Sequence, residues 1–339
     1  MKNAFPAAHL SPGAIFFKTI DLDRVDITDT TYRISTPTPV DGLMASIQEV
    51  GLLTPPLLRA SGSDRFIIIS GFKRISACRE LGLDTIDVRI AGEGLSDLDC
   101  CRMAIADNAN NRALNAVEQS AAVLKLSTFF DDDRTLSLEA RKAGLYVNPE
   151  LVKKLKKLTT VHAELMAPIA SGTLPLTIAL ELGSLDRDSA LAFLNLFETL
   201  KPTLNHQKEM LTLTREISLA GKIPAFQLIR DVTADMMMDE SLDRPQKIEK
   251  IRNNLQRLRY PEIMRFEKQF QDRLLRLNLP ECIRLVPPAN FEGTRFTLSL
   301  TFHDISQFKA CMEVLDLLYH HPDFKKILDK DIEDNPSIR

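Results

Sequence analysis

The residues best suited to chemistry lie in one short segment, where a β-branched run ends in Ser70-Gly71 and is followed by Lys73 and Arg74. This pattern predicts a strand that turns at a glycine into a helix. Such a turn leaves backbone N–H groups unpaired beside the positive end of the helix dipole. Because two cations stand at the same place, the segment is predicted to bind an anion, above all phosphate.

The cysteines and histidines do not form a pattern of this kind. The five cysteines are odd in number and contain no C-x-x-C pair, so they predict buried or idle thiols, not a disulfide framework or a zinc site. His320-His321 is an adjacent pair, and adjacent residues on a helix point apart. A metal role for this pair is not expected.

Charge is segregated along the chain, although the net charge of the 339 residues is only −3. Residues 134–160 carry seven cations against two anions, and residues 244–276 carry ten against four. The rest of the chain is therefore acidic. An acidic body with two basic segments is typical of a protein that contacts a polyanion at chosen places, although solvated helix faces would give the same pattern.

The first part of the chain alternates between strand and helix patterns. After a loose arm over residues 1–16, the pattern predicts an extended entry at 20–27, a helix over 43–50, a strand beginning at 57 and another at 66–69. A helix that ends at Gly82 and a strand over 85–90 follow. This alternation predicts a small α/β domain.

The middle of the chain is predicted to be helical. Helix patterns cover 97–110 and 117–130, with Asn115 as the N-cap of the second, and the Asp131–Asp133 run is predicted to be a solvated loop. Residues 136–143 and 149–158 then form two short helices around Gly144, with Asn148 as N-cap and Pro149 at the first helical position.

These two short helices form a helix-turn-helix pattern whose second helix is basic. Leu151, Leu155 and Leu158 form the predicted inner stripe, and lysines cover the outer faces. A basic second helix is suited to a DNA groove. The predicted DNA-binding residues are Arg141, Lys142, Asn148, Lys153, Lys154, Lys156 and Lys157.

The C-terminal part is predicted to hold amphipathic helices and a small separate unit. Apolar stripes run through 248–258 and 263–277, strands are predicted at 282–286 and 296–302, and a helix at 305–319. The fold class is therefore mixed, with an α/β first domain, an all-α middle and a small α+β C-terminal unit. The predicted boundaries are 17–112 for the α/β domain, 113–235 for the helical DNA-binding domain, 244–278 for the basic amphipathic helices and 280–325 for the C-terminal unit.

Taken in order, these pieces resemble the ParB family of bacterial partition proteins, whose first domain has the ParB/sulfiredoxin-like fold. Ser46-Ile47 with Gly51-Leu52-Leu53-Thr54-Pro55-Pro56 resembles the family's S-I-x-x-x-G-L-L-Q-P-P box. The segment from Ser70 to Ala77 resembles S-G-E-R-R-x-x-A. Asp107-Asn108 to Glu118 is similar to E-N-x-Q-R-x-x-L-N-P-I-E, and Tyr32-Arg33 stands where the family has an arginine.

The resemblance implies a DNA-binding dimer whose first domain binds CTP with magnesium and closes the dimer into a clamp. Carried over by position, the nucleotide-binding residues are Arg33, Thr54, Gly71, Lys73, Arg74, Asp107 and Asn108, and the metal-binding ones are Asp107 and Asn108. The resemblance also implies dimerisation through the C-terminal unit and a partition ATPase as a partner.

Several positions depart from the family pattern. Phe72 replaces the glutamate of the phosphate box, and Lys73 replaces an arginine, which removes a bidentate fork. Asp107 is one methylene shorter than the glutamate expected there, and Asn111 stands in place of an arginine, with Arg112 adjacent. These departures leave nucleotide hydrolysis an open question, and no catalytic residue is assigned.

Two other interpretations remain. Sulfiredoxins share this small α/β fold but need a reactive cysteine in the glycine turn, where Phe72 and Lys73 stand instead. A phosphoryl-transfer enzyme or nuclease needs a general base, for which Asp107 is the only good carboxylate in the segment. The sequence has no bilayer-length apolar run and no secretory signal pattern, so we expect a cytoplasmic, nucleoid-associated protein without a membrane segment.

Overall fold

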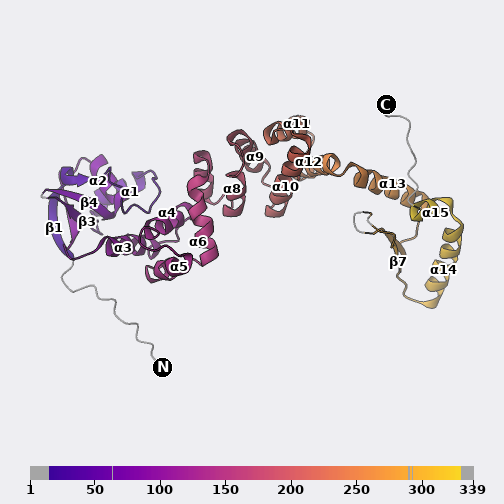
Figure 1. Cartoon of the computed structure of the whole chain (residues 1–339), viewed down its shortest axis with the longest axis horizontal. Coiled ribbons are helices and arrows are strands. Elements are labelled where there is room, and N and C mark those ends of the chain that lie inside the picture. The colour runs from indigo at the N-terminus through magenta and orange to yellow at the C-terminus, as the bar shows by residue number, and fades with distance from the viewer. Residues whose placement is uncertain (1–14, 63, 289–290, 292, 330–339) are drawn as a thin grey trace, which may run out of the picture. The chain divides into compact units, whose positions relative to one another are not determined.

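The computed structural model describes residues 15–62, 64–288, 291 and 293–329. The chain divides into two compact units, Met1–Glu198 and Thr199–Arg339. The first unit contains a sheet followed by helices, and the second contains helices followed by a two-stranded sheet (Figure 1). The mixed fold class predicted from the sequence is confirmed.

The first unit begins with a five-stranded sheet in the order β1-β5-β3-β4-β2. β1 is antiparallel to β5, β5 is parallel to β3, β3 is antiparallel to β4, and β4 is parallel to β2. The strand bounds are β1 Ile15–Asp21, β2 Val25–Asp26, β3 Leu57–Ser61, β4 Arg65–Ser70 and β5 Thr85–Ala91. The sequence had predicted residues 15 and 16 as part of a loose arm, but both belong to β1.

Two helices, α1 (Asp41–Val50) and α2 (Phe72–Glu80), complete the core of this domain. Ile47 of α1 and Ile75 of α2 are buried in one cluster with Leu58, Ile68 and Val88 of the strands. In β5 apolar and polar residues alternate, which gives the strand one buried face, whereas β4 holds a continuous apolar run and its last three residues are all buried. The turn between β4 and α2 is thereby fixed against a packed core.

The remainder of the first unit is helical. α3 packs against β4, and α4 packs against α3, α5 and α6. The bounds are α3 Asp97–Ala109, α4 Ala116–Leu126, α5 Asp133–Lys142, α6 Pro149–Lys156, α7 Met166–Ser171, α8 Leu176–Leu182 and α9 Arg187–Leu200, which crosses the boundary between the units. α4 ends four residues earlier than the 117–130 pattern predicts.

The second unit starts with four helices. α10, α11 and α12 pack on one another, and ion pairs from Arg252 to Glu209 and from Arg259 to Glu216 join α12 to α10. The bounds are α10 Leu204–Gly221, α11 Ala225–Met238, α12 Arg244–Arg259 and α13 Pro261–Leu277. Part of the second basic segment is therefore neutralised within the fold.

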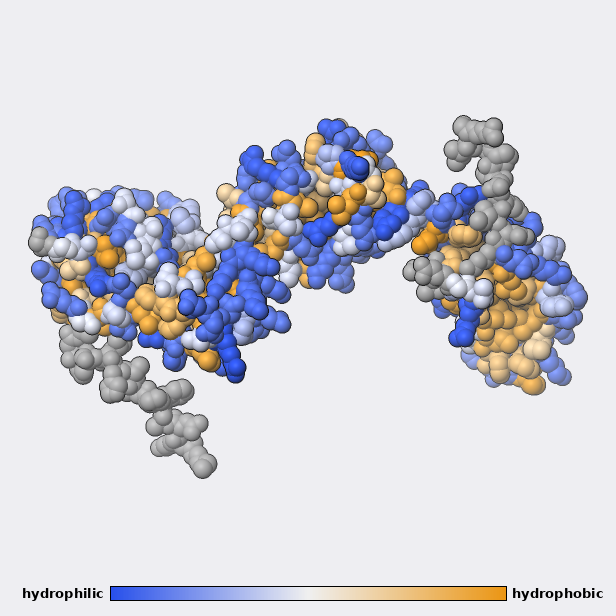
Figure 2. Space-filling view, in the orientation of Figure 1, coloured by the Kyte–Doolittle hydropathy of each residue, from blue (hydrophilic) through white to orange (hydrophobic). Residues whose placement is uncertain are grey.

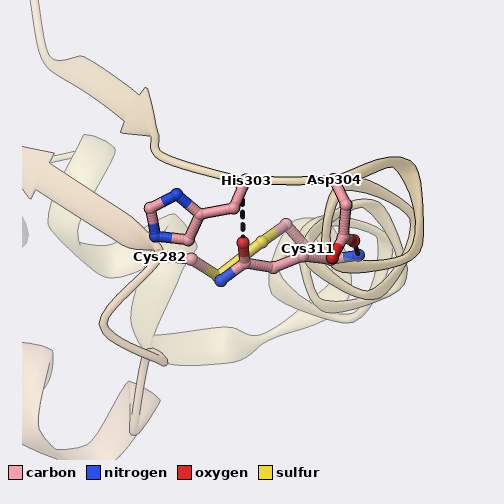
Figure 3. The surroundings of a disulfide bond; sticks show 5 residues. Cys282, His303, Asp304 and Cys311 are labelled. Atoms are coloured by element: carbon pink, nitrogen blue, oxygen red, sulfur yellow. Dashed lines mark hydrogen bonds between the residues drawn. A yellow bond between two sulfur atoms is a disulfide. The ribbon is translucent and has the colours of Figure 1, made fainter.

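The C-terminal part of this unit holds β6 (Ile283–Val286), antiparallel to β7 (Thr297–Leu300), with α14 (Ile305–His320) and α15 (Pro322–Leu328). A disulfide between Cys282 and Cys311 joins the start of β6 to α14 (Figure 3). The prediction that all cysteines are unpaired thiols is therefore wrong for these two. A pairing over 29 residues depends on the tertiary fold and leaves no local spacing pattern.

Within the described part of the chain, none of the helices is long and apolar enough to cross a membrane.

Candidate nucleotide and DNA sites

The turn between β4 and α2 has the geometry that its sequence predicts. Gly71 has a φ of +104°, in the left-handed region, and a Cβ built on it would lie 2.8 Å from Pro56 Cβ. α2 begins at Phe72, and no side chain of the described residues caps it. The first N–H groups of α2 are thus presented without a side-chain competitor, as a phosphate site requires.

Arg74 and Asp107 form one side of this site. Arg74 Nη1 donates to the carbonyl oxygen of Thr54 at 2.8 Å, and its Nη2 lies 3.1 Å from Asp107 Oδ2. The Ser70 hydroxyl donates to the same Asp107 oxygen. Asp107 therefore positions Arg74 against the turn, and Arg74 in turn holds the Thr54-Pro55 segment.

Lys73 lies in a second group of cations. It is half-buried, and its pKa is lowered by burial and by the like charges of Arg112 and Arg33, while Glu118 opposes the shift. Lys73 and Arg33 line one hollow of about 220 Å³, whereas Gly71, Arg74 and Asp107 lie outside it. The structure thus places these predicted nucleotide residues in two groups, with Arg33 and Lys73 at the hollow and Gly71, Arg74 and Asp107 outside it.

Phe72 explains one departure from the family pattern. Its ring is buried in the domain core, and the guanidinium carbon of Arg33 lies 5.4 Å from the ring centroid. A cation over an aromatic face is attracted by the ring quadrupole. Phe72 therefore orients Arg33, although it offers no carboxylate.

The predicted metal ligands are partly engaged by protein donors. Asp107 accepts from Ser70 and Arg74, and Asn108 Nδ2 donates to the Ala104 carbonyl at 2.8 Å, which leaves Asn108 Oδ1 as a candidate ligand. Among the described residues, no group of three or more His, Cys, Asp or Glu side chains could hold a metal. A magnesium ion here would depend on phosphate oxygens and water for most of its ligands.

Neither enzymatic alternative gains support from these contacts. Cys78 lies on the buried side of α2, and burial raises the pKa of its thiol, whereas a reactive cysteine needs a lowered one. Asp107 accepts two hydrogen bonds through one oxygen and lies beside two arginines, which disfavours its use as a general base.

Sequence reasoning placed Glu118 in a motif but gave it no function. The side chain is only 1% exposed. Arg112 donates to both of its oxygens at 2.6 Å, and the backbone N–H groups of Thr36 and Asn115 donate at 3.1 and 3.2 Å. Burial alone would raise the pKa of Glu118, but these hydrogen bonds outweigh it and hold the pKa below its ordinary value.

A segment that we call the strap, residues 30–37, runs beside α4. Lys125 Nζ donates to the carbonyls of Thr30 and Thr31 at 2.9 and 2.6 Å, and Glu118 binds Thr36. The strap and α4 line a groove of about 810 Å³. The Tyr32 hydroxyl accepts from Arg59 and donates to Asp97, which fixes the strap to the sheet and to α3.

The predicted DNA-binding helix, α6, presents most of its lysines to solvent. Lys153 and Lys154 of α6 and Lys157 of the turn after it are exposed, as are Arg141 and Lys142 at the end of α5. Figure 2 shows a hydrophilic surface over this hairpin. None of the ion pairs found between described residues involves these three lysines, so their charges are available to a ligand.

Two details of this hairpin differ from the sequence analysis. Lys156 is half-buried and its Nζ lies 2.7 Å from Asp133 Oδ1, so it is already paired. Val152, not Leu151, shares the fully buried stripe with Leu155. Asn148 is the predicted N-cap, and its side chain accepts from the Leu151 N–H at 2.7 Å.

Tyr146 is a candidate contact residue that the sequence analysis missed. It stands in the turn between α5 and α6 and is 78% exposed. The sequence signal was its place in the predicted turn between two aliphatic residues, Leu145 and Val147, which the structure shows to be buried. Such a side chain can make apolar contacts to a thymine methyl group or to sugar carbons.

A family model confirms the resemblance seen in the motifs. The model described as ParB N-terminal domain matches residues 14–109, which cover the sheet, α1, α2 and α3. This region is therefore similar to the N-terminal domain of ParB proteins. The predicted motifs at Gly51–Pro56 and Ser70–Ala77 lie inside the matched range.

Curated relatives extend the match beyond this domain. A nucleoid occlusion protein of Bacillus cereus (strain B4264) is 26% identical over 177 residues, which are 48% of this chain and 60% of the relative. A nucleoid occlusion protein of Bacillus mycoides (strain KBAB4) is 25% identical over 177 residues, with the same coverage of both chains. The match thus spans about three fifths of these relatives.

Solved structures of ParB from Caulobacter crescentus are also similar. A C-terminally truncated form complexed with CTP-gamma-S is 22% identical and covers 50% of this chain and 93% of that chain, with a TM-score of 0.26. The form complexed to the centromeric parS site is 18% identical and covers 56% and 96%, with a TM-score of 0.34.

The close approach of Gly71 to Pro56 predicts that a side chain at position 71 destabilises the fold. Gly71→Ala combines a left-handed backbone with a clash, and we expect it to lower the free energy of unfolding by about 3 kcal/mol in urea titrations. Gly82→Ala is the matched control, because φ is +69° there but nothing lies within 4 Å of the added Cβ. Its cost should be about 1 kcal/mol. Equal costs for the two variants would contradict the close approach.

Proposed function

We propose that this protein is a ParB-type partition protein that binds specific double-stranded DNA as a dimer and is gated by a nucleotide in its first domain. The observation that carries the proposal is the unpaired lysine face of α6, which directly follows a ParB N-terminal domain. Lysines without internal partners are available for phosphate contacts, which supply most of the affinity of DNA-binding proteins. The family resemblance adds a partition ATPase as a candidate partner.

The nucleotide part of the proposal rests on the cations around the start of α2. The N–H groups of α2, Lys73, Arg112 and Arg33 would hold phosphates. The carbonyls of Thr54 and Pro55, fixed by Arg74, can accept from an exocyclic amine such as that of cytosine. When bound, a magnesium ion would screen charge on the phosphates, with Asn108 as the free protein ligand and Asp107 positioning Arg74.

The dimer part of the proposal rests on the C-terminal unit. Exposed apolar side chains of β7, α14 and the segment between them gather there, including Leu298, Phe302, Ile305, Met312 and Leu317. Figure 2 shows this surface as a broad hydrophobic area. A patch of this kind is typical of a protein–protein interface. A two-fold dimer also suits a palindromic DNA site.

The DNA proposal predicts a change in salt dependence. Replacing Lys153, Lys154 and Lys157 with alanine removes three phosphate contacts, so the negative slope of log K against log salt should become smaller in magnitude by about 2.7. Fluorescence anisotropy with a selected duplex at several salt concentrations measures this slope. Lys156→Ala is the control, because its ammonium is already paired with Asp133, and its slope should remain that of the wild type. A triple variant with the wild-type slope would refute the role of α6.

The nucleotide proposal predicts that Lys73 contributes to affinity. A charge-assisted hydrogen bond to phosphate is worth about 1.5–3 kcal/mol, so Lys73→Ala should weaken CTP binding by about tenfold or more in calorimetry with Mg²⁺. Lys18→Ala, an exposed lysine of β1 in the same domain, is the control. Equal affinities for the two variants would show that the nucleotide, if it binds, lies elsewhere.

The dimer proposal predicts that one charge on the apolar surface dissociates the protein. Leu317 is 73% exposed on α14, and Leu317→Asp should convert the dimer to a monomer in sedimentation experiments at micromolar concentration. Leu219→Asp, at a leucine of α10 that is 75% exposed, should leave the dimer intact. A Leu317→Asp variant that stays dimeric would place the interface elsewhere.

A further inference from the structure

The buried carboxylate of Glu118 joins three segments that have different roles. It accepts two hydrogen bonds from Arg112, which follows α3, and one from the Thr36 N–H of the strap. It also caps its own helix, because the Asn115 N–H donates to it at 3.2 Å and the Asn115 side chain accepts from its N–H.

The strap depends on this carboxylate at one of its two ends. Lys125 holds Thr30 and Thr31, and Glu118 holds Thr36 through both its N–H and its hydroxyl. Glu118 and Lys125 are seven residues apart on α4, so they lie on one face of the helix. If the hydrogen bonds between Glu118 and Thr36 break, the strap remains attached at Lys125 and Tyr32, and its Thr36 end can move.

The same carboxylate is the counter-charge of the proposed phosphate-binding cations. The fork of Arg112 points both of its terminal nitrogens at Glu118, and Lys73 lies within electrostatic reach of Arg112, Glu118 and Arg33. Arg112 and Lys73 thus share one buried carboxylate. Phosphate oxygens match the fork geometry of arginine as well as a carboxylate does, so phosphate and Glu118 compete for the same donors.

We propose that Glu118 is an internal counter-anion that holds the strap closed and releases it when phosphate groups engage Arg112 and Lys73. Without Arg112, a carboxylate that is almost fully buried becomes uncompensated, and exposure to water is its favourable alternative. Movement of the Glu118 side chain frees the Thr36 end of the strap and removes its hydrogen bond to the Asn115 N–H, which is one half of the capping box of α4. α4 packs against α5 and α6, so the change reaches the DNA-binding hairpin. This inference rests on the proposed nucleotide site.

Hydrogen exchange of the strap, measured by mass spectrometry on the full chain, tests the proposal directly. We call the contact between Glu118 and Thr36 the latch. The Thr36 N–H donates to Glu118, so the exchange rate of this N–H reports whether the latch is closed. In the wild type, CTP and inorganic tripolyphosphate should each raise exchange in residues 30–37. Glu118→Gln should raise it about tenfold without any ligand, and neither anion should raise it further.

Glu139→Gln is the matched control. Glu139 is also buried and paired, with Arg102 and Lys142, but it lies on α5 away from the strap. In the Glu139→Gln variant, residues 30–37 should exchange at the wild-type rate and respond to both anions as in the wild type. Arg112→Gln is a second variant, in case Glu118→Gln fails to fold, and should loosen the strap and abolish the response to both anions.

The outcomes separate this inference from the nucleotide proposal. If calorimetry shows CTP binding while strap exchange stays constant, the latch is overturned and the nucleotide site stands. If tripolyphosphate opens the strap and CTP does not bind, the latch stands and the nucleotide assignment fails. If Glu118→Gln leaves strap exchange at the wild-type rate, or if neither anion binds or opens the strap, the latch is overturned.

Discussion

A carboxylate that is buried in a protein needs donors on all sides, and at Glu118 these donors come from segments that the chain must first bring together. Arg112 follows α3, Thr36 lies in the strap, and Asn115 precedes α4. These hydrogen bonds to Glu118 therefore form only when the sheet domain, the strap and the helical part are all in place. It fixes the start of α4, and α4 supports the hairpin with the exposed lysines.

The turn at Gly71 could be predicted from sequence because its rules are local. A β-branched run, a glycine and a helix pattern are enough to specify a left-handed residue between a strand and a helix. The distribution of the cations was not predictable in the same way. Successive residues on a helix point about 100° apart, so Lys73 and Arg74 reach different partners. Arg74 binds Asp107 and the Thr54 carbonyl, while the pKa of Lys73 is lowered by burial and by the like charge of Arg112.

The errors in the sequence analysis share a physical cause, which is contact between residues distant in the chain. Asp133 was expected in a solvated loop but begins α5 and pairs with Lys156, 23 residues away. Cys282 and Cys311 meet only because β6 and α14 lie together. β1 was missed because most of its side chains are exposed, which leaves an apolar run without alternation. Helix caps at Asn115 and Asn148, by contrast, were predicted correctly, because a cap is made within four residues.

The first unit has two groups of cations, the lysines of the α6 region and the arginines near the start of α2. They differ in whether carboxylates of the protein already compensate their charge, which suits them to different kinds of anion. Lys153, Lys154 and Lys157 take part in none of the ion pairs formed among the described residues, so any polyanion meets their full charge and salt weakens the contact. Arg112 and Arg74 already have carboxylates as partners. A single weak anion cannot displace such partners, whereas a ligand with several linked phosphates can, because one molecule supplies all the competing oxygens. In the proposed function, compensation by Glu118 and Asp107 would therefore favour a polyphosphate at the first site, whereas the lysine face would respond to charge alone.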